Sequence, residues 1–90
     1  MLACTLPCEE RLGLERDTCL AERMSEEGDV DLATALARQL EDRIVRHAAV
    51  LSWVEDHRDA DRAKLRELCG LLDGDHAELC ARRVDAAHLQ

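Results

Sequence analysis

The 90-residue sequence contains no phenylalanine, no tyrosine and a single tryptophan, Trp53. A hydrophobic core must therefore be built from Leu, Val, Ile, Ala, Met and Cys, a set that supplies few strand-forming residues. Only one proline and four glycines are present to interrupt helices. This composition predicts an all-α fold.

Long apolar runs and catalytic motifs are also absent. No run approaches the roughly 20 apolar residues that span a membrane, and the N-terminus lacks the basic and apolar regions of a signal peptide. The sequence has no G-x-S-x-G, P-loop or H-E-x-x-H motif, and it has only two serines and three threonines. We therefore expect a cytoplasmic protein that is not an enzyme and whose cysteines stay reduced.

The formal net charge is −8, and it is unevenly distributed along the chain. Residues 9–31 carry nine acidic residues against three arginines, a balance of −6, whereas residues 32–64 are neutral and residues 65–90 carry −2. This charge argues against direct binding of nucleic acid or of an anionic membrane, because both need a basic surface.

The acidic segment instead predicts a basic protein partner, for example a nucleic-acid-binding protein. Its candidate contacts are Glu9, Glu10, Glu15, Asp17, Glu22, Glu26 and Glu27. The alternative is a solvated acidic face that only keeps the protein soluble.

The hydrophobic pattern predicts one domain over residues 1–90, a small bundle of three or four helices with frayed ends. The expected helices are about 6–27, 31–57, 60–73 and 75–88. The second has the clearest apolar stripe, formed by Leu36, Leu40, Ile44, His47, Leu51 and Val54. Either Asp29 or Asp31 can cap its N-terminus.

Residues 55–64 interrupt this stripe and leave two alternatives. A turn around residues 57–59 would give a compact bundle, and it is the favoured alternative. An unbroken helix as far as Asp73 would instead need a partner chain to cover its apolar face.

Other local signals refine these boundaries. Gly13 lies inside the first expected helix and weakens it. Asp42 and Arg46 are spaced to form a favourable i,i+4 pair on the second helix. Gly74 suits the end of the third helix, and Asp75 can cap the fourth.

Five cysteines occur, and four of them form two pairs with equal spacing. Cys8 and Cys19 are eleven residues apart, as are Cys69 and Cys80, so each pair shares one face of a continuous helix. One interpretation is a soft-metal site for Zn or Cu, because thiolates and imidazoles are their usual ligands. Its candidate ligands are Cys69, His76 and Cys80, completed by Cys8, Cys19 or Cys4.

Two other interpretations compete with metal binding. Cysteine is a small and frequently buried residue, so these cysteines can serve simply as core residues, which is the favoured interpretation. The matched spacings also resemble those of small mitochondrial proteins built as helical hairpins with paired cysteines. That resemblance implies two disulfides, although residues 20–68 separate the two pairs here.

Two further residues have alternative roles. We expect His47, on the apolar stripe, to be a buried neutral residue rather than a ligand. Trp53 is either the central core residue or an exposed anchor for a partner.

The sequence therefore predicts a small acidic protein-binding module, a regulator, adaptor or inhibitor that can also self-associate. The alternative is a metal-binding bundle for storage or sensing; we expect no cofactor, with Zn or Cu as the exception.

Overall fold

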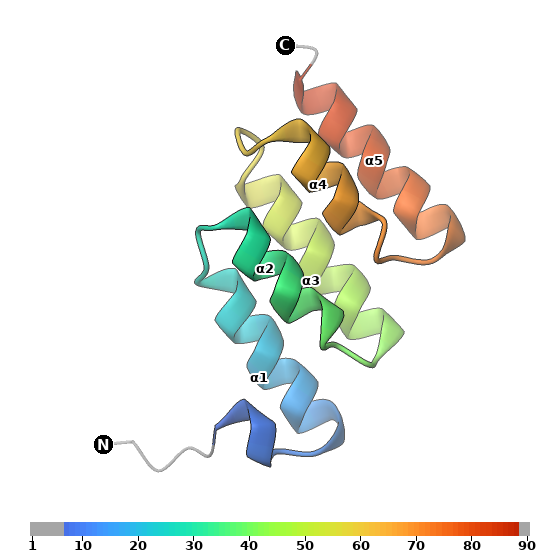
Figure 1. The fold of residues 1–90 in the computed structure, drawn as a ribbon. Helices are drawn as coiled ribbons and strands as arrows, with labels where there is room; N and C mark the ends of the chain where they lie inside the picture. Colours follow the sequence, from blue (N-terminus) through green and yellow to red (C-terminus); the bar gives the residue numbers. More distant parts are fainter. Residues whose placement is uncertain (1–6, 89–90) are drawn as a thin grey trace.

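The computed structural model describes residues 7–88, which contain five α-helices, one short 3-10 helix and no strand. In chain order these elements are η1 (Cys8–Glu10), α1 (Gly13–Ser25), α2 (Val30–Arg38), α3 (Arg43–Asp56), α4 (Arg62–Cys69) and α5 (Gly74–His88), shown in Figure 1. The predicted all-α class is confirmed, with five helices rather than three or four. The expected frayed ends fall on residues outside this range. Among residues 7–88, no helix combines the length and the apolar character needed to cross a membrane.

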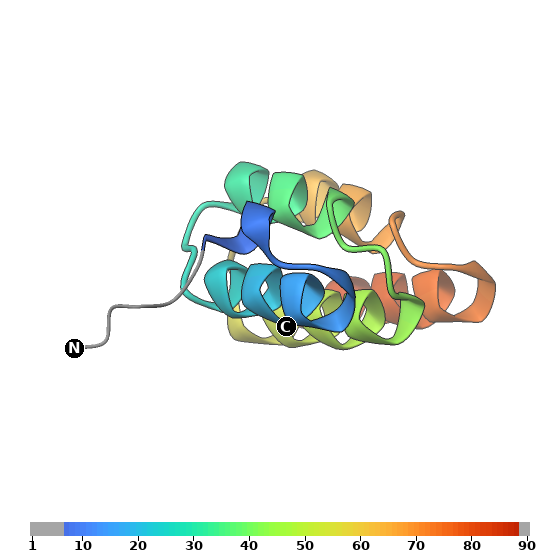
Figure 2. The same ribbon diagram turned by 90° about the horizontal axis from the view of Figure 1, so that it is seen from below.

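The helices form two layers. Figure 2 shows α1, α3 and α5 side by side in one layer and α2 and α4 in the other. Contacts join α1 to α3, α3 to α5 and α2 to α4, and each helix also touches the next one in the chain. This alternation resembles the stacking in helical-repeat proteins, where each element is supported mainly by its immediate neighbours.

Trp53 belongs to the larger of the two hydrophobic clusters of the core. It is 2% exposed, and its indole Nε1 donates a 2.8 Å hydrogen bond to the carbonyl oxygen of Glu27. The other members of this cluster are Met24, Ala33, Ala37, Val50, Val54, Leu65, Leu68, Cys69, Leu72, Cys80 and Val84. Of the two alternatives for Trp53, its position is therefore that of a core residue and not that of an exposed anchor.

Aspartates begin three of the helices, as short polar side chains commonly do. Asp29 caps α2 by accepting hydrogen bonds from the N–H groups of Asp31 and Leu32, at 2.7 and 3.3 Å. Asp61 caps α4 through the N–H of Lys64. Because α3 ends at Asp56 and α4 begins at Arg62, residues 57–61 form the favoured turn, and the continuous helix to Asp73 is excluded.

The first helix is shorter than predicted. The expected helix 6–27 is divided into η1 and α1, because Leu12 is extended and Gly13 has a φ of +58°. This left-handed conformation suits glycine, which lacks a Cβ atom. Gly13 therefore starts α1 instead of weakening its interior.

The second predicted helix, 31–57, is also divided, here at residues 39–42. No glycine or proline marks this break; Asp42 instead caps α3 through the N–H groups of Ile44 and Val45. Asp42 is thus used as a cap, and Arg46 donates to backbone carbonyls rather than forming the predicted i,i+4 pair. The break also disrupts the expected stripe, and Ile44 is 79% exposed.

The last helix starts at Gly74, one residue before the predicted start at residue 75, and its cap differs from the predicted one. The N–H groups of His76 and Ala77 donate to the backbone carbonyl oxygen of Asp73, so Asp75 lies within the first turn and is not the cap. Gly74 has a φ of +37° and belongs to α5, whereas α4 already ends at Cys69.

Candidate functional site

The four cysteines within residues 7–88 form two disulfides. Cys8 of η1 is bonded to Cys19 of α1, and Cys69 of α4 is bonded to Cys80 of α5. Their Cα atoms lie 5.6 and 5.5 Å apart despite a sequence separation of 11. A continuous helix would hold such residues roughly 16 Å apart. Each disulfide therefore requires the helix break between its two cysteines, and the expectation that these cysteines stay reduced is wrong.

The predicted metal ligands are not gathered into one group. Sulfur atoms joined in a disulfide offer no thiolate to a soft metal. Within residues 7–88, no group of three or more His, Cys, Asp or Glu side chains is placed to hold a metal ion. His76 packs against His47 instead, and Cys4, the alternative fourth ligand, lies outside the described residues.

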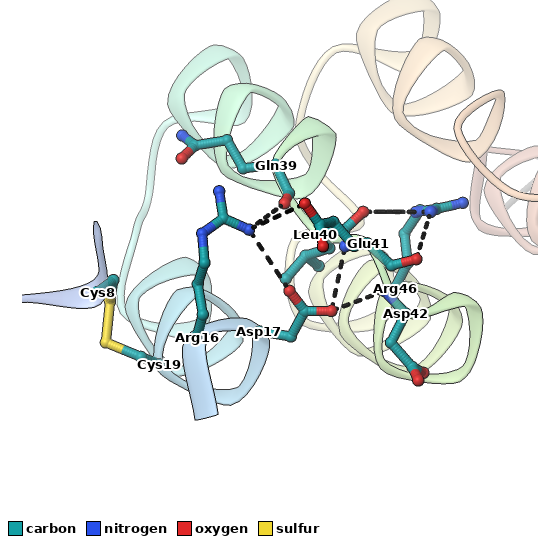
Figure 3. A network of polar contacts seen from close by, with 9 residues as sticks. All are labelled: Cys8, Arg16, Asp17, Cys19, Gln39, Leu40, Glu41, Asp42 and Arg46. Atoms are coloured by element: carbon teal, nitrogen blue, oxygen red, sulfur yellow. Dashed lines mark hydrogen bonds and ion pairs between the residues drawn. A yellow bond between two sulfur atoms is a disulfide. The ribbon is translucent and has the colours of Figure 1, made fainter. Parts of the chain in front are cut away.

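A buried polar network holds the junction between α2 and α3 (Figure 3). Asp17 of α1 is 2% exposed, and its Oδ2 atom accepts hydrogen bonds from the N–H groups of Glu41 and Asp42, at 3.1 and 2.7 Å. The Arg46 guanidinium donates to the carbonyl oxygens of Leu40 and Glu41. The two charged side chains thereby satisfy backbone groups that the helix break leaves unpaired.

This network corrects the predicted partner-binding set. Asp17 is buried, with Oδ2 bound to two backbone N–H groups and Oδ1 near the Arg16 guanidinium, so it is a structural residue and not a surface contact. Trp53 is equally buried and also leaves the set. Neither assignment could be made locally, because Asp17 stands among exposed acidic residues and its hydrogen-bond partners are 24 and 25 residues away.

The remaining predicted acidic residues lie on η1, on α1 and in the two residues after α1, and all of them except the half-buried Glu27 are exposed. Glu9 pairs with Arg23 at 3.8 Å. The other five carboxylates have no ion pair with any residue in 7–88, and we call them the acidic surface: Glu10, Glu15, Glu22, Glu26 and Glu27. Two exposed leucines lie beside them, Leu12 at 85% and Leu14 at 59% exposure.

An apolar groove of about 370 Å³ lies between α1 and α3. Partly buried Val45 and Ala49 line it together with buried Trp53. The other lining residues are Thr18, Ala21 and Ser25 from α1 and Ile44, Ala48, Ser52 and Asp56 from α3. We call this feature the α1–α3 groove. Sequence reasoning missed it because Ile44 was assigned to the core stripe.

Two histidines meet between α3 and α5. The rings of His47 and His76 are stacked, with centroids 3.9 Å apart and an interplanar angle of 27°. His47 Nδ1 is buried without a hydrogen-bond partner among the described residues. Desolvation first, then His76 and Arg83, lower the pKa of His47 below its ordinary value of 6.5, which fits the predicted neutral form. The side chain is half-buried, however, rather than buried as predicted.

Comparisons of the chain with known protein families, with curated proteins and with solved structures find no match. Its function must therefore be inferred from its surfaces.

Proposed function

We propose that the protein is a small acidic docking module that binds a basic protein through the α1 end of the helical stack. The observation that carries this proposal is the concentration of unpaired negative charge there. Five carboxylates of the acidic surface have no ion pair within residues 7–88. Such a surface attracts a basic partner and speeds its association.

Many of the acidic residues elsewhere are neutralised by nearby bases. The pairs include Arg38 with Glu67, Arg43 with Asp73, Arg62 with Asp85, Lys64 with Asp31, Arg82 with Glu78 and Arg83 with Glu55. An acidic surface that only keeps the protein soluble does not require its unpaired carboxylates to be concentrated at the α1 end. The contrast between the unpaired acidic surface and the paired carboxylates elsewhere therefore supports a binding role.

Apolar residues at the same end provide contact area. Leu12 and Leu14 project large side chains into solvent beside the acidic surface. Buried apolar area supplies most of the affinity in protein association, whereas exposed charges mainly set the association rate and exclude wrong partners. Leucines beside carboxylates therefore suit a partner with both basic and apolar residues.

The mechanism is docking without catalysis. A partner whose basic surface binds nucleic acid would be occupied by this acidic surface, so the module would act as its inhibitor or adaptor. The metal-binding alternative is not pursued, because four of its candidate ligands are joined in disulfides.

The test compares two triple variants with the same change in net charge. One carries Glu10→Gln, Glu15→Gln and Glu22→Gln; the control carries Asp31→Asn, Glu67→Gln and Glu78→Gln, whose carboxylates are already paired. A partner isolated by cross-linking is purified, and its association rate is measured at several salt concentrations. We expect the first variant to associate about tenfold more slowly, with a weaker salt dependence, and the control to resemble wild type. Equal rates for both variants would contradict the proposal.

A further inference from the structure

The α1–α3 groove is open to solvent along much of two parallel helices. The parallel direction follows from two contacts, since Asp17 binds the N–H of Asp42 near the start of α3 and Glu27 accepts from Trp53 near its end. Helix α3 has 14 residues, which corresponds to about 20 Å. The groove is therefore elongated rather than round, and it matches a helical segment better than a compact small molecule.

Apolar atoms dominate the lining of the groove. The indole of Trp53 and the side chains of Val45 and Ala49 lie at its base, while Ala21 and Ala48 leave room for side chains from outside. Ile44 stands 79% exposed at one end, where its burial by an occupant would be favourable. An amphipathic helix that inserts apolar residues spaced at i, i+3, i+4 and i+7 fits such a surface.

The charges around the groove favour a helix whose polar face is basic. Asp56 lines the groove itself, and Glu22 adjoins it, being four residues after Thr18 and three before Ser25 on α1. Neither carboxylate has an ion pair within residues 7–88. The C-terminal ends of α1 and α3 add the negative ends of two helix dipoles near Asp56. A second copy of this chain, with its own charge of −8, would be repelled.

We propose that the α1–α3 groove binds one amphipathic helix of the partner, with its apolar face on Ile44, Ala48 and Ala21 and with Lys or Arg along its flank. This inference rests on the proposed function and names the segment of the basic partner that is recognised. Glu22 of the acidic surface adjoins the groove, so one docking event would use both surfaces.

The experiment titrates the full disulfide-bonded protein with two synthetic 14-residue helical peptides that lack tryptophan and tyrosine. Both have the same apolar face; one carries Lys and Arg on its flank and the other carries Glu. Because Trp53 is the only tryptophan and tyrosine is absent, its emission reports on the base of the groove directly. Binding is also followed by the anisotropy of a dye on the peptide.

Matched variants place the binding in the groove. Ile44→Ser and Ala48→Arg alter the groove, while Leu32→Ser and Ala35→Arg make the same changes at exposed positions of α2 in the other layer. We expect the basic peptide to shift the Trp53 emission and to bind about tenfold more weakly to the groove variants, with the α2 variants close to wild type. Thermal melting checks that all four variants are folded.

Three results of the peptide titration would overturn the inference, and a fourth comes from sedimentation. They are no binding of the basic peptide, equal binding of the acidic peptide, and equal losses in the groove and α2 variants. A dimer in sedimentation that Ile44→Ser dissociates would make a second copy the occupant and would also overturn it. If the peptide fails while the intact partner still depends on Glu10, Glu15 and Glu22, only this inference falls and the proposed function stands.

Discussion

Replacing Asp17 by alanine removes a buried carboxylate of α1 that binds the backbone at the start of α3. Its Oδ2 atom accepts two backbone N–H groups, at 3.1 and 2.7 Å, in a position only 2% exposed. Hydrogen bonds to a charged group contribute about 1.5–3 kcal/mol each, and a buried donor left unpaired adds its desolvation penalty. Because one oxygen atom serves both donors, and because alanine favours helix, we expect a net loss of about 3 kcal/mol.

The Asp17→Asn variant distinguishes the contribution of the acceptor oxygen from that of the negative charge. The asparagine carbonyl oxygen can occupy the position of Oδ2 and accept both N–H groups, while its amide replaces Oδ1, which lies 3.7 Å from the Arg16 guanidinium. The loss should therefore be smaller, about 1 kcal/mol. Glu15→Ala removes the same charge from an exposed site that has no ion pair with residues 7–88, and it should change stability by less than about 0.5 kcal/mol.

The assay is urea unfolding of the oxidised protein, followed by far-ultraviolet circular dichroism at 25 °C. A domain of this size has a free energy of unfolding of roughly 5–15 kcal/mol, so a loss of 3 kcal/mol is readily resolved. The reasoning would be refuted if Asp17→Ala were as stable as Glu15→Ala. It would also fail if Asp17→Asn were as unstable as Asp17→Ala, because the acceptor oxygen would then be irrelevant.

Three further predictions concern stability. Replacing both Cys69 and Cys80 by alanine opens a loop of 11 residues and should lower the free energy of unfolding by about 3 kcal/mol, measured by urea unfolding; a variant as stable as wild type would show that the disulfide does not constrain the chain. Gly13→Ala should cost about 1 kcal/mol because its φ is +58°, whereas Gly28→Ala, with a negative φ and free space for a Cβ atom, should be neutral or slightly stabilising in thermal melting. Because the pKa of His47 is lowered in the folded protein, the unfolded chain binds more protons below pH 6.5. The contribution of His47 to the free energy of unfolding should therefore be fully present above pH 6.5 and be lost as the pH falls below it. His47→Gln should flatten this dependence in thermal melts across about pH 5–8.

The disulfides occupy the two ends of the helical stack, where support from neighbouring helices is weakest. Cys8–Cys19 ties η1 onto α1, and Cys69–Cys80 ties α4 to the last helix, α5. In stacked helical architectures the terminal elements have a neighbour on one side only and open most easily. The two covalent links thus lie where they can most reduce local opening.

Composition and periodicity determined what depends on short stretches of chain. A core without Phe or Tyr and a supply of helix-forming residues were sufficient for the all-α class. The cap of α2 was narrowed to Asp29 or Asp31, and a turn around residues 57–59 was the favoured of two alternatives. These features are local, because a helix and its cap are encoded within a few adjacent residues.

The tertiary structure alone decided the features that depend on distant partners. The break at residues 39–42 carries no glycine or proline, and it is stabilised by Asp17 from another helix. That break turns Ile44 outward and opens the α1–α3 groove, while the breaks near Gly13 and Gly74 bring cysteines 11 residues apart into bonding distance. Periodicity describes one continuous helix, so it cannot report where a side chain 24 residues away makes stopping that helix more favourable than extending it.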